Sequence, residues 1–191
     1  MQHLILASNS KQRAIILETL KIPFTIIPAN IQEKAIRHTN LKKQAVAIAQ
    51  AKAQFVGHDH PGIIIAADTF NVVGTHVFEK PKDKKHAFHM LEELSGKESV
   101  CYTGYCYIDK QNKIFVADAV TIRVRFRDLS KTDIMRHVQT HPVTQWAAGF
   151  SPAYTDTLHL VASIQGSLTG FSHGLPLERI ISLLKKSGFF V

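Results

Sequence analysis

The chain has 191 residues, of which 45% are hydrophobic, and its formal net charge at pH 7 is +8. This length and composition suit one domain or two closely packed lobes with a sizeable core, which excludes an intrinsically disordered protein. Unbroken apolar runs such as residues 63–67 fall far short of the roughly 20 residues that a membrane-spanning helix needs. The N-terminus does not read as a signal peptide. We therefore predict no membrane association.

The positive charge has three readings: a nucleic-acid surface, a site for a small polyanion, or a basic protein whose charge is simply spread out. The dense basic clusters are residues 80–85 and Lys185-Lys186, and neither is interleaved with aromatic residues as in a single-strand binder. Nucleic acid is therefore not the partner that we expect. Cys101 and Cys106 would point to opposite faces of one strand, which disfavours a disulfide and favours the cytoplasm.

Strands and helices alternate in the first half of the chain. The apolar periods and capping residues predict, in order, a strand at 3–7, a helix at 11–20 capped by Ser10, a strand at 24–27, a helix at 41–56 closed by Gly57, a buried strand at 63–67, a hairpin at 71–78 around Gly74-Thr75, and a helix at 84–94.

The second half starts with two long strands. The pattern predicts strands at 100–108 and 114–126, a helix from Ser130 to about Gln139, a strand at 158–164 and a closing helix at 177–186. Repeats, linkers and low-complexity segments are not evident in the sequence. These elements predict an α/β fold, with a mixed sheet and flanking helices.

Three charged residues occupy positions where the pattern expects apolar side chains. Arg13 lies on the apolar stripe of the first helix, and Lys52 lies on that of the second, where Leu41, Ala45, Ile48 and Phe55 form the stripe. Asp68 directly follows the buried strand. A buried charge costs several kcal/mol unless it is paired or functional. Each charge alone reads best as a satisfied ion pair, but the three together favour a shared pocket.

The first strand–helix junction is small and polar. Ser8 precedes a helix N-terminus, where free N–H groups and the positive dipole end favour a phosphate, and Arg13 could add a bidentate contact. An ordinary capped helix is the competing interpretation. Glu33 lies in a polar loop and reads by itself as a solvated carboxylate, yet with Asp68 it could hold a hard cation such as Mg²⁺. Lys80, before Pro81, reads by itself as a surface lysine.

A series of short motifs resembles the Maf family of nucleoside triphosphate pyrophosphatases, once described as septum-formation inhibitors. The motifs occur in family order and span residues 3 to about 186: Leu4–Ser10 with Arg13, Glu33, Ala51–Ala53, Ile65–Thr69, Lys80-Pro81, Ser95–Lys97, Tyr102–Gly104 and Gly174–Leu177. The resemblance implies one domain over residues 1–191, with two lobes around a cleft and a fold similar to that of the inosine-triphosphate pyrophosphatases.

The resemblance also implies an activity: hydrolysis of the α–β phosphoanhydride of a canonical or modified nucleoside triphosphate, giving the monophosphate and pyrophosphate. It makes Asp68 the proton acceptor and associates Glu33 with catalysis, and the two carboxylates would hold a divalent cation, Mg²⁺ or else Mn²⁺. Ser8, Arg13, Lys52 and Lys80 are then expected to hold the triphosphate. A homodimer is also what the family suggests.

Three positions that differ between family branches are occupied by Gln12, Thr69 and Tyr154. They match neither the thymidine/uridine branch nor the N7-methylguanosine branch, so the nucleobase stays open. Tyr154 could stack on a base or simply pack at an edge. Lys11 and Glu79 also depart from the family pattern, which has proline and glycine there. These departures sustain an alternative: a catalytically weak nucleotide-binding or regulatory protein that affects cell division.

Overall fold

The computed structural model describes residues 2–74 and 76–190, which form two compact units. The first unit comprises the described residues of Met1–Thr69, Tyr102–Val120 and Thr169–Val191, and the second comprises those of Phe70–Cys101 and Thr121–Leu168. Three long strands, β3 (Ile63–Val73), β5 (Glu98–Asp109) and β6 (Ile114–Phe126), supply residues to both. Among the described helices, none has the length and apolar character to cross a membrane.

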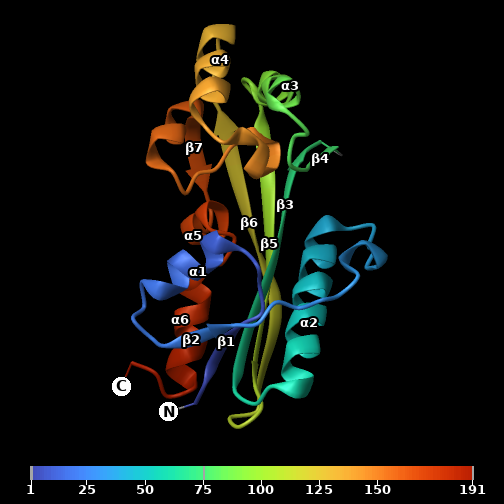
Figure 1. Cartoon of the computed structure of the whole chain (residues 1–191), viewed down its shortest axis with the longest axis vertical. Coiled ribbons are helices and arrows are strands. Elements are labelled where there is room, and N and C mark those ends of the chain that lie inside the picture. Colours follow the sequence, from blue (N-terminus) through green and yellow to red (C-terminus); the bar gives the residue numbers. More distant parts are fainter. Residues whose placement is uncertain (1, 75, 191) are drawn as a thin grey trace. The chain divides into compact units, whose positions relative to one another are not determined.

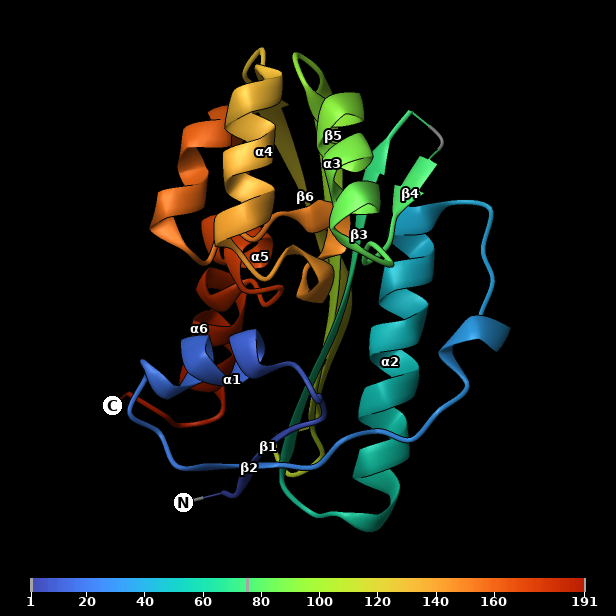
Figure 2. The ribbon, with the colours of Figure 1, turned by 45° about the horizontal axis from the view of Figure 1, so that its top comes forward.

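The sheet is mixed, with the strand order β2-β1-β3-β5-β6-β7 and with β4 paired to β3. In the first unit, β1 (Leu4–Leu6) pairs in parallel with β2 (Phe24–Ile26) on one side and with residues 63–65 of β3 on the other. The helices of this unit are α1 (Lys11–Glu18), α2 (Leu41–Asp59), α5 (Leu168–Ser172) and α6 (Leu177–Lys186), and Glu33–Ala35 form a 3₁₀ turn. Figures 1 and 2 show α2 on one side of these strands and α1 and α6 on the other.

One face of the first unit is packed with small side chains under α2. Ile64 and Ala66 of β3 contact Ala49, Ala53 and Val56 of α2 in one buried cluster. The close approach also needs a glycine in β5: a Cβ added to Gly104 would lie 2.3 to 2.5 Å from backbone atoms of Ala45 and Val46. Backbone cannot move aside as a flexible side chain can, so Gly104 sets the spacing between α2 and the sheet.

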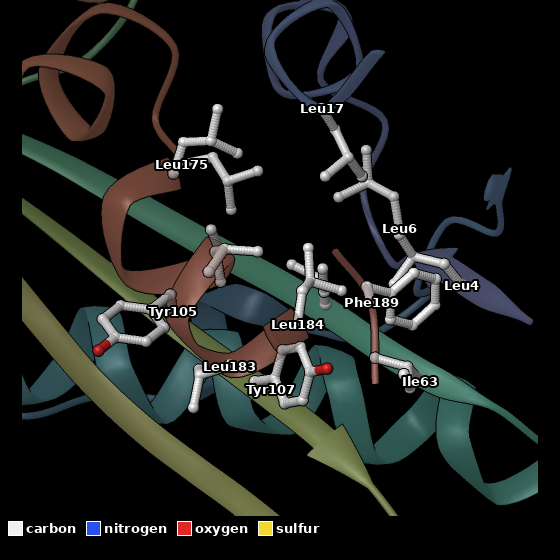
Figure 3. Close-up of a cluster of buried hydrophobic side chains, with 14 of the residues drawn as sticks. Leu4, Leu6, Leu17, Ile63, Tyr105, Tyr107, Leu175, Leu183, Leu184 and Phe189 are labelled. Atoms are coloured by element: carbon white, nitrogen blue, oxygen red, sulfur yellow. The ribbon is translucent and has the colours of Figure 1, made fainter. Parts of the chain in front are cut away.

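The opposite face holds the larger cluster, shown in Figure 3. Strand residues alternate between faces, so Ile63, Ile65 and Ala67 of β3 and Tyr105 and Tyr107 of β5 point away from α2. They pack against the apolar stripes of α1 and α6 and against the C-terminal residues; the buried members from these segments are Ala14, Leu17, Leu175, Leu177, Ile180, Leu183, Leu184 and Phe189.

The second unit adds β4 (His76–Phe78), which pairs antiparallel with residues 71–73 of β3, and β7 (Val161–Gln165), which pairs antiparallel with residues 123–126 of β6. Its helices α3 (Lys84–Leu94) and α4 (Lys131–Thr140) pack against each other. Short 3₁₀ segments at 143–145, 147–149 and 155–160 connect α4 to β7.

The predicted α/β class with a mixed sheet is confirmed, and so are α3, α6, β6, the Ser10 and Ser130 caps and the 71–78 hairpin, of which Thr75 lies outside the described residues. Four details are wrong. Gly57 does not close α2, which continues to Asp59, and Phe55 is 47% exposed instead of buried. Residues 158–160 are 3₁₀ turn, not strand. The buried strand at 63–67 extends to Val73, because β4 pairs with its second half.

Gly104 provides a test of the packing between α2 and the sheet. We expect Gly104→Ala to lower the free energy of unfolding by about 3 kcal/mol, because the new methyl group meets backbone that cannot give way. Gly57→Ala is the matched control: its Cβ would lie 3.3 Å from a side-chain atom of Ile64, a milder contact than one with backbone, and alanine favours the helix by about 1 kcal/mol. Urea unfolding measures both variants, and equal destabilisation would contradict the assigned role of Gly104.

Candidate functional site

A lysine buried between two carboxylates forms the centre of the candidate site. The Nζ of Lys52 lies 2.8 Å from Oδ1 of Asp68 and 3.0 Å from Oε1 of Glu33. Lys52 is only 7% exposed and Asp68 only 9%, whereas Glu33 is exposed. The ammonium group is thus compensated by one buried and one solvent-accessible carboxylate, which is the pairing that a buried charge requires.

The alternation of β3 explains why Asp68 faces Lys52. Ile64, Ala66 and Asp68 fall on the face that α2 covers, and Lys52 lies on the buried side of α2 among its alanines. The expectation that Asp68 follows the strand is wrong, because Asp68 lies inside β3, between the segments that pair with β1 and β4. The carboxylate is therefore held by regular strand geometry on both sides.

Burial and charge act against each other on Asp68. Loss of solvent is the largest effect and raises the pKa of this carboxyl above its ordinary value of 3.8. The positive charge of Lys52, its hydrogen bond and the charge of Arg13 oppose the rise, while Glu33 adds to it. A carboxylate that is desolvated but still paired with cations is a suitable proton acceptor.

Arg13 approaches from the other face of β3 and is held by three groups of the first unit. Its Nε donates to the carbonyl oxygen of Gly174 at 2.8 Å, one Nη donates to Oγ of Ser8 at 3.0 Å, and the other donates to Oγ1 of Thr69 at 3.4 Å. The backbone N–H of Ser10 also donates to Ser8 Oγ, at 3.1 Å. The planar guanidinium is thereby fixed in orientation.

The backbone conformation of Gly174 suits its contact with Arg13. Its φ is +65°, in the left-handed region that favours glycine, and a Cβ there would lie 3.0 Å from Thr69 Oγ1 and 3.4 Å from two nitrogens of Arg13. A side chain at this position would therefore be strained and would press on the groups that hold Arg13.

Arg13 and Asp68 influence each other's pKa values through their charges. Burial lowers the pKa of Arg13 below its ordinary value, and the charges of Asp68 and Glu33 oppose that shift. Arg13 and the Lys52–Asp68 pair thus lie in the first unit and affect each other's charge, while a shared pocket for the three residues stays a prediction.

Comparison with known proteins bears on what this site does. Residues 3–187 match the family described as Maf-like protein. The chain is 33% identical over 188 residues to a protein of Ruminiclostridium cellulolyticum named dTTP/UTP pyrophosphatase, with 97% of this chain and 96% of that protein covered. The chain belongs to the Maf family.

The relatives differ in the bases for which they are named. A protein of Thermosipho africanus is 34% identical, with 97% of this chain and 93% of that protein covered, and it is also named dTTP/UTP pyrophosphatase. A protein of Nitrosococcus oceani is 30% identical, with 97% of this chain and 94% of that protein covered, and it is named 7-methyl-GTP pyrophosphatase. Among solved structures, a HAM1 protein from Coxiella burnetii has a similar fold, with a TM-score of 0.50 and 16% identity over 97% of this chain and all of that one.

The remaining residues of the Maf resemblance are distributed over both units. Gln12 lies in α1 next to Arg13 and is partly buried. Lys80 and Tyr154 belong to the second unit. Lys80 is exposed after β4, and Tyr154 is 45% exposed with its ring 5.0 Å from the ring of Trp146.

Sequence reasoning assigned no role to two polar contacts of this Maf-family site. The hydroxyl of Thr103 lies 3.3 Å from that of Thr69 and donates to the carbonyl oxygen of Gly170 at 2.8 Å. Thr103 and Gly174 occur in the family motifs, but only folding places Gly174 beside Arg13 and Thr103 beside Thr69. A signal was present: Thr103 interrupts the apolar face that Tyr105 and Tyr107 continue.

The raised pKa of Asp68 predicts a pH dependence of stability. Because the folded state binds this proton more tightly than the unfolded state, the contribution of Asp68 to the free energy of unfolding falls as the pH rises above 3.8 and through the raised pKa. Asp68→Asn removes this dependence. We expect the stability of the variant relative to the wild type to increase as the pH rises from 3.8 through the raised pKa of Asp68 in urea unfolding. A difference that is constant or decreases with pH would contradict the shift.

Proposed function

We propose that this chain hydrolyses a nucleoside triphosphate between its α- and β-phosphates, releasing the nucleoside monophosphate and pyrophosphate. The observation that carries the proposal is the buried Asp68 carboxylate paired with Lys52, with Arg13 close enough to shift its pKa. One proton acceptor flanked by cations suits attack of water on a polyphosphate. The names of the full-length Maf relatives support the same reaction class.

Asp68 is the proposed proton acceptor. Water attacks a phosphorus of the α–β bridge, its proton passes to Asp68, and the bridging P–O bond breaks with its electron pair on the leaving phosphate oxygen. Desolvation makes the carboxylate more basic than an exposed aspartate, while the charges of Lys52 and Arg13 favour its ionised form. Both effects are needed in one group, because a protonated Asp68 could not accept the proton.

Arg13, Lys52 and Ser8 are the proposed triphosphate ligands in the first unit, and Lys80, a residue of the second unit, is proposed as a ligand from the Maf resemblance alone. The three contacts of Arg13 use one N–H on each nitrogen, which leaves an N–H on each terminal nitrogen for phosphate oxygens. Ser8 Oγ accepts two hydrogen bonds, from Ser10 and Arg13, so its own proton can be donated to the ligand. Cations fixed in this way stabilise the charge that develops in the transition state.

Glu33 and Asp68 would hold the divalent cation, for which we propose Mg²⁺, with Mn²⁺ as a second choice. The donor set fits: two carboxylates converge within 3.0 Å of the Lys52 ammonium, so their oxygens already face a single positive charge. Within residues 2–74 and 76–190, no group of three His, Cys, Asp or Glu could hold a metal. Phosphate oxygens and waters would have to complete the coordination, as is usual for Mg²⁺. When bound, the cation would screen the phosphate charge and polarise water.

Gln12, Thr69 and Tyr154 do not decide which nucleobase the substrate carries. The hydroxyl of Thr69 faces Arg13 and Thr103, which suggests a role in holding Arg13 in addition to any contact with a base. The ring of Tyr154 lies against Trp146, which would support it as a stacking platform. Relatives are named for both pyrimidine and methylated guanosine triphosphates, so both belong in the test.

The activity is tested with purified protein, Mg²⁺ and a panel of nucleotides that includes dTTP, UTP, 7-methyl-GTP and the canonical triphosphates. We expect pyrophosphate release from at least one of them, and Asp68→Asn should lower kcat by about 10²- to 10⁴-fold, the usual contribution of a general base. Asp59→Asn is the control, because Asp59 is an exposed carboxylate at the end of α2.

Three results would contradict the proposal. Equal activity of Asp68→Asn and the wild type would remove Asp68 from the reaction. Thermal stabilisation by nucleotides without pyrophosphate release would instead support the binding or regulatory alternative. Phosphate release in place of pyrophosphate would show cleavage at a different phosphoanhydride.

A further inference from the structure

We infer that Thr103, although it belongs to neither the proposed catalytic nor the proposed binding set, is a positioning residue that fixes Arg13 through Thr69. The inference rests on the proposed function for its kinetic consequence and on geometry for everything else. Thr103 is fully buried in β5, and its side chain lies on the same face as Tyr105 and Tyr107, where the apolar cluster gives way to polar groups.

The direction of each hydrogen bond follows from counting protons. A threonine hydroxyl has one proton, and Thr103 donates it to the carbonyl oxygen of Gly170 at 2.8 Å. At the 3.3 Å contact between the two threonines, Thr69 must therefore be the donor. Thr69 Oγ1 then presents its lone pairs to the N–H of Arg13, 3.4 Å away. The result is a directed relay of contacts from Arg13 through Thr69 and Thr103 to Gly170.

Both ends of this relay attach to one short stretch of backbone. Gly170 accepts from Thr103, and Gly174, four residues later, accepts from Nε of Arg13. Thr169 ties the same stretch to α6, because its Oγ1 accepts from the N–H of Leu177 and donates to Glu178. Arg13 is thus held against a segment that is itself tied to α6 through Thr169.

The relay explains why Thr103 has to be a hydroxyl residue instead of valine, which has the same shape. Valine would fill the space but would leave the Gly170 carbonyl without this donor and the Thr69 proton without this acceptor. Thr69 could then turn its proton toward Arg13, where two donors would face each other. The guanidinium would lose one of the three contacts that fix its orientation, although no residue that contacts the proposed substrate has changed.

The test compares Thr103→Val with Thr103→Ser, which keeps the hydroxyl. We expect Thr103→Val to raise KM about tenfold with kcat within about threefold of the wild type, because the proposed role of Arg13 is to bind the triphosphate while Asp68 is untouched. Thr103→Ser should restore KM. The substrate is dTTP or 7-methyl-GTP, whichever the wild type hydrolyses faster.

Tyr107→Phe is the matched control for loss of a buried hydroxyl, because Tyr107 lies on the same face of β5 and its OH lies 2.7 Å from Oγ of Ser187. We expect it to lower stability without changing KM. Should Thr103→Val fail to fold, Thr69→Val interrupts the same relay one contact closer to Arg13. If both variants fold, their effects on KM should be less than additive, since they break one pathway.

A second readout needs no substrate. In the ligand-free protein, the guanidinium of Arg13 should give separate NMR signals for its terminal N–H groups, because its contacts hinder rotation. These signals are identified by their loss in Arg13→Lys, and they should merge in Thr103→Val and reappear in Thr103→Ser. If the wild type hydrolyses no triphosphate, the proposed function fails but this measurement still decides the inference. Unchanged Arg13 signals and unchanged KM in Thr103→Val would overturn it.

Discussion

A buried ammonium group needs nearby negative charge, and the Lys52 side chain meets that need with Asp68 at 2.8 Å and Glu33 at 3.0 Å. Removing Lys52 would leave the Asp68 carboxylate buried without its nearest cation, and removing Asp68 would leave the ammonium group with only the exposed Glu33, so either change should destabilise the core. The same arrangement opposes the rise that burial causes in the pKa of the Asp68 carboxyl. The chemistry that we propose and the packing of α2 on the sheet therefore depend on one cluster of charges.

In contrast to Lys52, which is held by two carboxylates, Arg13 is held by neutral groups. It has no ion-pair partner within contact distance among the described residues, and it is held by a carbonyl and two hydroxyls. Neutral acceptors orient the guanidinium without cancelling its charge, which remains available to an anionic ligand. The site thus combines a compensated cation on the α2 side with a largely uncompensated one on the α1 side, and a polyphosphate would restore the balance.

The sequence allowed much of this to be predicted, for physical reasons that differ between residues. Arg13 and Lys52 stood out because helical periodicity places them on apolar stripes, and a buried charge is rare without a cause. Asp68 is a candidate because it follows a run of buried apolar residues in the sequence. The strand itself continues past Asp68 because its second half pairs with β4. The pattern assigns no role to Thr103 or Gly174, because an uncharged threonine or glycine does not stand out from an apolar pattern. Both also act through contacts with residues that are distant in the sequence.

Asp68 and Thr69 are neighbours in the chain, yet they serve opposite faces of β3: the first meets Lys52, and the second meets Arg13. Strand periodicity is two, so removing one residue between Ile63 and Ala67 would exchange the faces and turn a carboxylate toward the tyrosines and a methyl-bearing alcohol toward the lysine. Evolution can thus vary the loops around this strand freely but cannot change its length by an odd number before Asp68. Insertions and deletions in relatives should be confined accordingly to segments outside residues 63–69.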